Sequence, residues 1–296
     1  MRSGFVAVVG RPNVGKSTLV NALVGEKVAI TSSRPQTTRN TIRGVLTVPE
    51  EGEPEVQAVF VDTPGLHRPR TALGEHLNTL VDASVEDADV VLFVLDAHQP
   101  IGPGDRRVAE RVQRSSVDVV VVVNKVDLAA PGEVVEMLAE ASEWGLASYI
   151  PISATKGEGI ETVAEEVLSR LPEGPPYFPP GMRSDQRDGF MIREIIREKY
   201  LDRLRDELPH SLAVDIRDLE TRDNGSLYVD AALVVERDSQ KGIVIGRKGE
   251  LIRQCGQEAR EELERRFGVK VFLDLRVVVE KDWQEQPLLF DRMGFE

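Results

Sequence analysis

Five short apolar segments in the first half of the chain constrain its fold more than any other feature. They are residues 5–9 (FVAVV), 56–62, 89–96, 117–124 and 147–153. Amphipathic stretches such as EVVEMLAEASEW separate most of them, which is typical of strands that alternate with helices. Strands that are apolar along their whole length need helices on both faces of their sheet. We therefore predict an α/β domain with a mostly parallel sheet and a further strand near Gly44–Val48.

A proline-rich stretch, LPEGPPYFPPG, interrupts this pattern, because proline fits neither a helix interior nor a central strand. We expect a first domain over residues 1–172, a linker over 173–189 and a second domain over 190–296. The second domain reads as α-β-β-α-α-β, which indicates a small α+β fold. Its first helix is expected to present one apolar face, made of Ile192, Ile195, Ile196, Leu204 and Leu208.

Composition limits the classes of function. A net charge of −13 argues against a protein that coats nucleic acid indiscriminately, although Lys241–Lys270 holds eight basic residues and five glutamates. On charge alone, a solvated helix face explains that segment. The apolar runs are far shorter than the ~20 residues of a membrane span, and no signal peptide is evident. The single cysteine, Cys255, excludes an internal disulfide. We expect a cytoplasmic protein.

A glycine-rich loop follows the first apolar segment. Gly10 to Thr18 reads GRPNVGKST and matches G-x-x-x-x-G-K-[ST] between a strand and a helix. Backbone N–H groups of such a loop surround phosphate oxygens, and the helix N-terminus favours negative charge. Lys16 is expected to reach the β- and γ-phosphates, and the Ser17 hydroxyl is expected to bind Mg²⁺. The candidate phosphate-binding residues are Gly10, Arg11, Pro12, Asn13, Val14, Gly15, Lys16, Ser17 and Thr18.

Two further motifs select the base. NKVD follows the fourth apolar segment, and the carboxylate of Asp127 can accept hydrogen bonds from N1–H and the exocyclic amine of guanine, a donor pair that adenine lacks. The stem of Lys125 can lie on the ring. SAT, at the end of the next segment, can present a backbone N–H to the guanine carbonyl oxygen. The candidate base-binding residues are Asn124, Lys125, Asp127, Ser153, Ala154 and Thr155.

Two segments are expected to sense the γ-phosphate. DTPG (Asp62, Thr63, Pro64 and Gly65) ends the second apolar segment, so that Asp62 can hold Mg²⁺ through water and the Gly65 N–H can contact the phosphate. In PQTTRNT (35–41), Thr38 is expected to close over Mg²⁺, with Thr37 as the alternative; an ordinary threonine-rich loop is the other interpretation. The candidate catalytic residues are Lys16, Thr38, Asp62 and Gly65, and the direct metal ligands are Ser17 and Thr38.

With these motifs in this order, residues 5–171 resemble the small GTPases of the translation-factor class. In Ras-like proteins a glutamine follows the DxxG glycine and orients the attacking water. Here that residue is Leu66, so we expect slow intrinsic hydrolysis and water positioning by backbone, a bound ion or a partner. Asn13 resembles the asparagine with which related bacterial GTPases hold K⁺; alternatively, it only stabilises the loop.

The second domain carries the sequence GRKG between two helical segments. Gly246, Arg247, Lys248 and Gly249 form the G-x-x-G of a type II KH domain, whose loop contacts the backbone of about four nucleotides of single-stranded RNA. Arg247 and Lys248 are expected to meet phosphates. The preceding GIVIG is expected to form one wall of a groove for bases.

Together, GRPNVGKSTLVNALVG, PQTTRN, DTPGLH, NKVD, SAT, IIREKYLDRLRDELPHS and VIGRKG resemble the Era family of bacterial ribosome-assembly GTPases across the whole chain. The resemblance implies GTP, GDP and Mg²⁺ as ligands. It also implies binding to the 3′ end of small-subunit ribosomal RNA in 30S precursor particles during late assembly, in a conformation promoted by GTP. Peripheral association with the inner membrane is known in the family, but nothing in the composition supports it. No heptad run is present, and we expect a monomer.

Two alternatives remain at this point. A GTPase that assists chemistry such as tRNA modification would need a cofactor site or a reactive cysteine in the second domain, where Cys255 is the only cysteine. A signalling switch at the membrane or in the cell cycle would use the KH-like domain to bind a protein. Substitution of Arg247 and Lys248 separates this last alternative from RNA binding.

Overall fold

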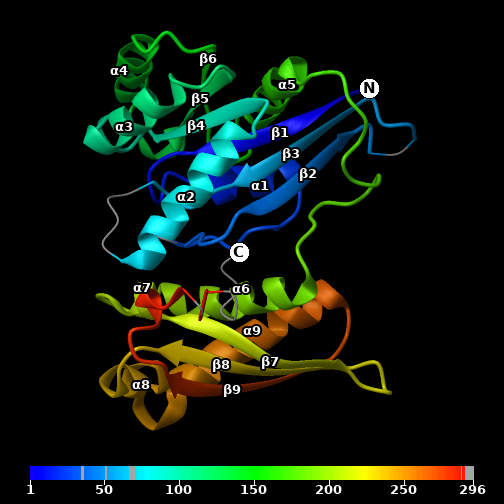
Figure 1. The fold of residues 1–296 in the computed structure, drawn as a ribbon, viewed down its shortest axis with the longest axis vertical. Helices are drawn as coiled ribbons and strands as arrows, with labels where there is room; N and C mark the ends of the chain where they lie inside the picture. The colour runs from blue at the N-terminus through cyan, green and yellow to red at the C-terminus, as the bar shows by residue number, and fades with distance from the viewer. Residues whose placement is uncertain (35–36, 51, 67–70, 288, 291–296) are drawn as a thin grey trace. The chain divides into compact units, whose positions relative to one another are not determined.

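The computed structural model describes residues 1–34, 37–50, 52–66, 71–287 and 289–290. The chain forms two compact units. One comprises Met1–Thr31, Thr38–Pro69 and Gly74–Gln186, and the other comprises Ser32–Thr37, Arg70–Leu73 and Arg187–Glu296. Figure 1 shows a helix-covered sheet in each unit.

The first unit is built on a six-stranded sheet in the order β2-β3-β1-β4-β5-β6. Only β2 runs antiparallel to its neighbour β3, and the other pairs are parallel, so the predicted mostly parallel sheet is confirmed. The strands are β1 (Arg2–Val9), β2 (Ile42–Val48), β3 (Val56–Asp62), β4 (Val90–Asp96), β5 (Asp118–Asn124) and β6 (Ser148–Pro151).

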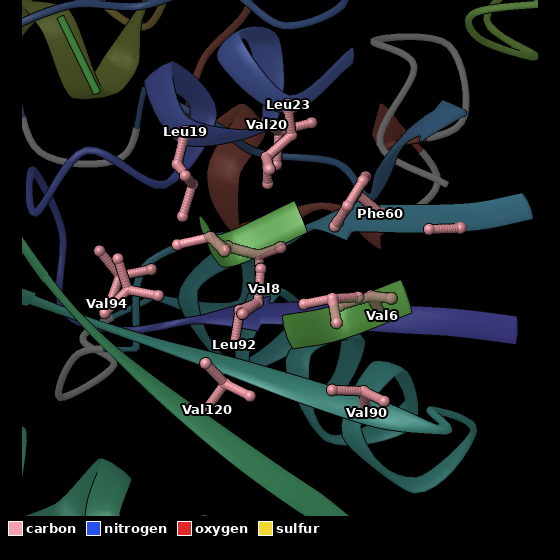
Figure 2. Packing of buried hydrophobic residues seen from close by; sticks show 14 of the residues in the cluster. Val6, Val8, Leu19, Val20, Leu23, Phe60, Val90, Leu92, Val94 and Val120 are labelled. Carbon is pink, nitrogen blue, oxygen red and sulfur yellow. The ribbon is translucent and has the colours of Figure 1, made fainter. Parts of the chain in front are cut away.

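Helices cover both faces of this sheet, as the apolar strands require (Figure 1). Alternate residues of β4 point to opposite faces: Leu92 packs with helices α1 and α5, whereas Phe93 packs with α2, α3 and α4. Figure 2 shows Leu19, Val20 and Leu23 of α1 above the sheet residues of the first of these cores. The helices are α1 (Lys16–Val24), α2 (Ala72–Glu86), α3 (Pro103–Val112), α4 (Pro131–Ser142) and α5 (Ile160–Arg170).

The proline-rich stretch is bound to the first unit along much of its length. The side chain of Gln57 on β3 accepts hydrogen bonds from the N–H groups of Tyr177 and Phe178 (2.8 and 3.0 Å) and donates to the Phe178 carbonyl (2.9 Å). Ser184 forms a bridge with Gly44 of β2. Residues up to Gln186 therefore belong to the first unit, and the change of unit falls at Arg187.

Apart from the additional four-residue helix α7, the second unit has the order of a type II KH domain, α-β-β-α-α-β, with its helices on one face of a three-stranded sheet (Figure 1). Strand β8 pairs antiparallel with β7 and parallel with β9. The elements are α6 (Asp188–Leu201), α7 (Leu208–Ser211), β7 (Ala213–Thr221), β8 (Leu227–Val235), α8 (Asp238–Ile245), α9 (Glu250–Phe267) and β9 (Val271–Val279).

The first helix of this unit is shorter than its apolar pattern predicts. Helix α6 ends at Leu201, so Leu204 and Leu208, which we expected on the same helix, lie in the following turn and in α7. Both are nevertheless buried in the same core as Ile192 and Ile195. The spacing signalled burial correctly, but a turn can bring side chains to a core as well as a helix can.

The core of the first unit provides a test of this packing. Leu92 is fully buried, whereas Leu128 is 59% exposed, and both belong to the first unit. Leu92→Ala should lower the free energy of unfolding by about 2–5 kcal/mol, because it removes buried methyl groups and leaves a cavity. Leu128→Ala should change it by less than about 0.5 kcal/mol. Urea denaturation followed by fluorescence measures both, and equal losses would contradict the assigned core.

Candidate functional sites

The glycine-rich loop lies between the end of β1 and the start of α1. Its glycines allow close approaches: a Cβ on Gly10 would lie 2.5 Å from the Val94 carbonyl oxygen, and one on Gly15 would lie 2.2 Å from Nδ2 of Asn124. The Lys16 ammonium is buried and donates to the carbonyls of Gly10 (3.3 Å) and Arg11 (3.0 Å). Thr18 follows in the first turn of α1. The loop thus surrounds the position that the sequence assigns to phosphates.

Three oxygen-bearing side chains meet beside Lys16. The Ser17 hydroxyl donates to Oδ2 of Asp62 (2.6 Å), and Oγ1 of Thr38 lies 2.9 Å from the Ser17 oxygen and 3.3 Å from Oδ2 of Asp62. Thr37 is elsewhere, because its hydroxyl donates to the Arg34 carbonyl (2.6 Å). Of the two threonines, the structure brings Thr38 to this cluster. Pro35 and Gln36 of the same motif, and His67, lie outside the described residues.

Burial opposes both charges of this cluster. It raises the pKa of Asp62 to about 6 and lowers the pKa of Lys16 to about 8, while the two side chains partly stabilise each other's charge. Oδ1 of Asp62 is buried and accepts no hydrogen bond from the described residues. A carboxylate with a free oxygen beside two hydroxyls is a set of hard oxygen ligands of the kind that Mg²⁺ prefers. The residues present therefore fit a magnesium ion.

The DTPG segment lies directly against the glycine-rich loop. A Cβ on Gly65 would lie 2.6 Å from the backbone nitrogen of Pro12, so this contact requires glycine. The Leu66 N–H donates to the Gly10 carbonyl (3.2 Å). Thr63 stabilises the start of this segment, because its buried hydroxyl donates to the Val8 carbonyl (2.7 Å). Pro64 connects Thr63 to Gly65. The backbone of residues 62–66 is thus placed beside the phosphate loop.

Asn124 joins three of the predicted motifs. Its Nδ2 donates to the Val14 carbonyl (2.9 Å), and its Oδ1 accepts from the N–H groups of Lys125 (2.8 Å) and Ala154 (3.0 Å). The glycine-rich loop, NKVD and SAT are therefore held together by one buried amide. In this structure the side chain of Asn124 therefore connects loops by hydrogen bonds.

Lys125 is anchored by a residue that the sequence analysis missed. Its ammonium donates to Oδ2 of Asp96 and to the Asn13 carbonyl, both at 2.6 Å. Asp96 is buried at the end of β4. In the sequence, a carboxylate at the end of an apolar strand could have indicated this role. Asn13 has φ 64°, a left-handed conformation that asparagine tolerates. The Asn13 carbonyl thus has a structural part in holding Lys125.

Asp127 and SAT lie next to each other. The Ser153 hydroxyl donates to Oδ1 of Asp127 (2.6 Å), and Oγ1 of Thr155 lies 3.3 Å from the same hydroxyl. Ser153 therefore orients a carboxylate whose exposed position leaves it accessible to a base.

The GRKG turn connects α8 to α9 in the second unit. Gly246 and Gly249 have φ values of 76° and 74°, in the region that favours glycine. A Cβ on Gly246 would lie 2.6 Å from Cβ of Leu251. Arg247 and Lys248 are exposed. The turn therefore presents two cations on a tightly packed backbone.

A groove of about 410 Å³ begins at this turn. Apolar side chains from α9 and β9 line it together with two arginines of α9, a combination suited to bases and phosphates. Within GIVIG, Val244 is buried in the core whereas Ile243 is 54% exposed. The wall that we expect GIVIG to form stays a prediction. The lining residues are Gly249, Ile252, Arg253, Gly256, Gln257, Arg260, Leu273 and Leu275.

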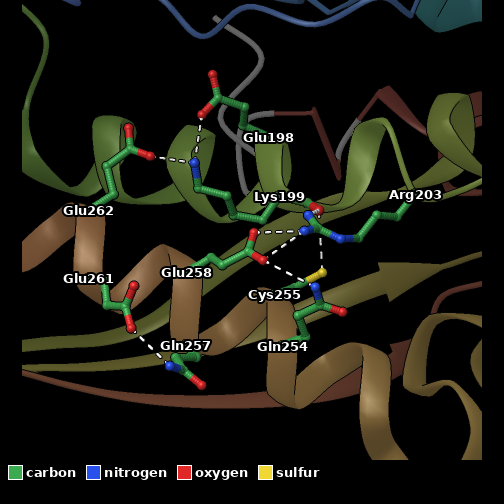
Figure 3. Close-up of polar contacts among 9 residues, drawn as sticks. All are labelled: Glu198, Lys199, Arg203, Gln254, Cys255, Gln257, Glu258, Glu261 and Glu262. Atoms are coloured by element: carbon green, nitrogen blue, oxygen red, sulfur yellow. Dashed lines mark hydrogen bonds and ion pairs between the residues drawn. The ribbon is translucent and has the colours of Figure 1, made fainter.

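Cys255 is a core residue whose surroundings do not activate it. It is fully buried between α9 and α6, where its thiol lies 3.3 Å from the Lys199 carbonyl. Burial raises the pKa of the thiol to about 11. Figure 3 shows it beneath the ion pairs of Arg203 with Glu258 and of Lys199 with Glu262. A thiol in this position is held protonated.

Comparisons with known proteins agree with both units. The family model described as "50S ribosome-binding GTPase" matches residues 5–125, and the one described as "KH domain" matches residues 207–284. The chain is 44% identical to GTPase Era of Halothermothrix orenii, with 100% of this chain and 99% of the relative covered. It is 47% identical to GTPase Era of Mycobacterium sp. strain JLS, with 99% of each covered. The chain belongs to the Era family of GTPases.

Solved Era structures have the same fold. A crystal structure of Era in complex with MgGDPNP and nucleotides 1506–1542 of 16S ribosomal RNA matches with a TM-score of 0.95 and 37% identity, covering 100% of this chain and 99% of that one. A single-substitution variant of Aquifex aeolicus Era bound to GDP·AlF4⁻ matches with a TM-score of 0.94 and 37% identity over the same shares. Membership in this family makes the chain a GTPase that uses GTP, GDP and Mg²⁺.

The environment of Cys255 leads to a prediction. Because the thiolate is the nucleophile and burial raises the pKa of this thiol to about 11, a disulfide reagent such as DTNB should react at pH 8 far more slowly than with free cysteine. Unfolding in urea should restore the rate of a free thiol. A spectrophotometric time course measures both. Rapid labelling of the native protein, with activity lost in parallel, would show a functional thiol instead.

Proposed function

We propose that this chain is a GTP-hydrolysing switch that binds the 3′ end of small-subunit ribosomal RNA and assists late assembly of the 30S subunit. The observation that carries the proposal is one chain that holds both the clustered nucleotide motifs around Asn124 and a basic KH groove. The solved complex of the related Era contains both kinds of ligand, MgGDPNP and 16S ribosomal RNA. We further propose that the protein acts in the cytoplasm as a monomer on 30S precursor particles.

In the nucleotide site, the phosphates lie among the backbone N–H groups of the loop from Gly10 to Ser17. Lys16 neutralises the β- and γ-phosphates, and the Gly65 N–H donates to the γ-phosphate. Ser17 and Thr38 would hold Mg²⁺, with Asp62 acting through water, and the bound ion would neutralise charge on the phosphate oxygens. Asp127, oriented by Ser153, accepts from the guanine edge.

The side chain of Leu66 has no group that can orient the attacking water. Intrinsic hydrolysis is therefore slow, and the missing contribution comes from backbone, a bound ion or a partner. K⁺ held by Asn13 remains one such source. Slow hydrolysis suits a switch that stays on its RNA until assembly has advanced.

In the KH unit, Arg247 and Lys248 contact phosphates of a single strand, and its bases enter the groove between α9 and β9. The apolar side chains of that groove, Ile252, Leu273 and Leu275, pack against bases, while Arg253 and Arg260 add charge. Binding by this unit is sensitive to salt, because each phosphate contact releases counterions.

The alternatives are weaker. A role in tRNA modification needs a reactive thiol or cofactor in the second unit, and Cys255 is buried with a raised pKa. A membrane-bound switch would have to rely on peripheral contact, since no helix among the described residues has the length and apolarity to cross a bilayer. A protein-binding role of the KH unit predicts binding that does not depend on Arg247 and Lys248.

Base selection provides a direct prediction. Xanthine presents an N1–H donor beside a carbonyl acceptor, so Asp127→Asn, which offers one acceptor and one donor, should prefer xanthine nucleotides. GDP affinity should fall at least about fivefold, because a donor of guanine is left unpaired. Displacement of a fluorescent nucleotide by GDP and by XDP measures the exchange. Asp127→Ala serves as the control: it should lose GDP affinity without gaining XDP affinity.

The whole proposal is tested with a labelled oligonucleotide of the small-subunit rRNA 3′ end, titrated with protein holding a GTP analogue or GDP at two salt concentrations. The structure selects the variant: Gly246→Asp would force its Cβ against Leu251, whereas Arg247→Asp/Lys248→Asp changes exposed side chains only. Arg265→Asp/Arg266→Asp, at the other end of α9, makes the same change in charge and is the matched control.

We expect salt-sensitive binding that is tighter with the GTP analogue and is reduced at least tenfold by the change at the turn but little by the control. Circular dichroism and thermal unfolding like those of the wild type would show that the variants are folded, and nucleotide affinity should be unchanged. Absence of RNA binding in both nucleotide states would refute the assembly role while leaving the GTPase intact. Retained RNA binding in the turn variant would refute the assigned groove.

A further inference from the structure

A second basic cleft lies in the first unit, apart from the KH groove. It has a volume of about 640 Å³ and lies between α2 and α3, where the glycine-rich loop and Leu66 close one end. Four arginines and one glutamate line it. The lining residues are Arg11, Pro12, Leu66, Asn78, Gly104, Arg107, Val108, Glu110, Arg111 and Arg114. A neighbouring cleft of about 500 Å³ shares Arg111 and Arg114 and continues along the same two helices.

Two of these arginines form ion pairs within the first unit. Arg11 pairs with Asp105 of α3 at 3.0 Å and donates to Gln99 (2.8 Å), and Arg111 pairs with Asp82 of α2. These pairs place the two guanidinium groups in the walls of the cleft. They also leave the groups with further N–H donors, because a guanidinium carries five.

The other two arginines have no such partner among the described residues. Arg107 and Arg114 are exposed and form no ion pair within the described part of the chain. Spacings of four and seven residues place Arg111 and Arg114 on the same face of the helical segment as Arg107. By contrast, Arg106, the neighbour of Arg107, lies outside the cleft and pairs with Glu140. The unpaired charges of Arg107, in α3, and of Arg114, two residues beyond its end, therefore both border the cleft.

The cleft shares residues with the nucleotide site. Arg11 and Pro12 belong to the glycine-rich loop, and Leu66 is bound to that loop through its N–H bond to the Gly10 carbonyl. The stem of Arg11 passes Gly104 so closely that a Cβ there would lie 2.6 Å from Cδ of Arg11. A ligand in the cleft would thus touch residues that flank the γ-phosphate position, so its affinity should depend on the bound nucleotide.

We propose that the cleft between α2 and α3 is a second binding site for the phosphodiester backbone of RNA. The proposal rests on the proposed function. In a chain of net charge −13, unpaired arginines gathered along an open cleft with Leu66 and Val108 in its lining suit a sugar–phosphate chain. The RNA in the related complex spans nucleotides 1506–1542, which is longer than the about four nucleotides that a GxxG turn contacts.

The test uses the full chain and an RNA covering the same 3′-end segment as that complex. The variant is Arg107→Ala/Arg114→Ala, which removes the two unpaired charges. The matched control, Arg43→Ala/Arg106→Ala, removes two exposed arginines of the same unit that pair with Asp185 and Glu140 outside the cleft. Affinity is measured from low to moderate salt with the GTP analogue and with GDP. Nucleotide affinity and hydrolysis without RNA should stay unchanged in both variants.

We expect the cleft variant to lower RNA affinity by about tenfold at low salt. The salt slope should fall by about 1.4, since each lost phosphate contact removes about 0.7. The loss should add to that of Arg247→Asp/Lys248→Asp if the two sites bind separate phosphates.

Each contrary outcome has a distinct meaning. If the wild-type chain binds no RNA, both the proposed function and this site are refuted. If the wild-type chain binds RNA through the KH turn but the cleft variant behaves like its control, this site alone is refuted. An acidic protein surface would then be the occupant to seek.

Discussion

The hydrogen bonds of Asn124 are the constraint on which the nucleotide site depends. One buried amide at the end of β5 ties the glycine-rich loop, the following lysine and the SAT loop into a single arrangement. These loops meet because parallel strands end at the same edge of the sheet. Position 15 requires glycine, because a Cβ there would clash with the side-chain amide of Asn124. The side chain of Asn124 therefore fixes the positions of these loops relative to one another.

Burial disfavours the charged forms of two side chains in that site. Lys16 and Asp62 are buried without enough hydrogen bonds to compensate fully, and burial shifts the pKa of each toward its neutral form. Phosphates beside Lys16 and a cation beside Asp62 would restore both charges. We therefore expect that binding of nucleotide and Mg²⁺ offsets the desolvation free energy of these two groups. The binding loops should then be more stable with ligand than without it.

The two basic surfaces proposed to contact RNA belong to a chain of net charge −13. Arg247 and Lys248 are exposed at the KH turn, and Arg107, Arg111 and Arg114 border a cleft in the other unit. A negative net charge opposes indiscriminate binding of RNA. We therefore expect binding at these sites rather than affinity for any polyanion.

The sequence alone determined the mostly parallel sheet, the order of the KH unit and the residues of the nucleotide motifs. Apolar periodicity and loop chemistry are local properties, so a single sequence displays them. The tertiary structure decided that Thr38 and not Thr37 joins Ser17 and Asp62, that Asp96 anchors Lys125, and that α6 stops before Leu204. It also decided that arginines spaced along α3 face a cleft, because that requires α2 to pack opposite. These facts depend on contacts between segments far apart in the chain, which no local pattern encodes.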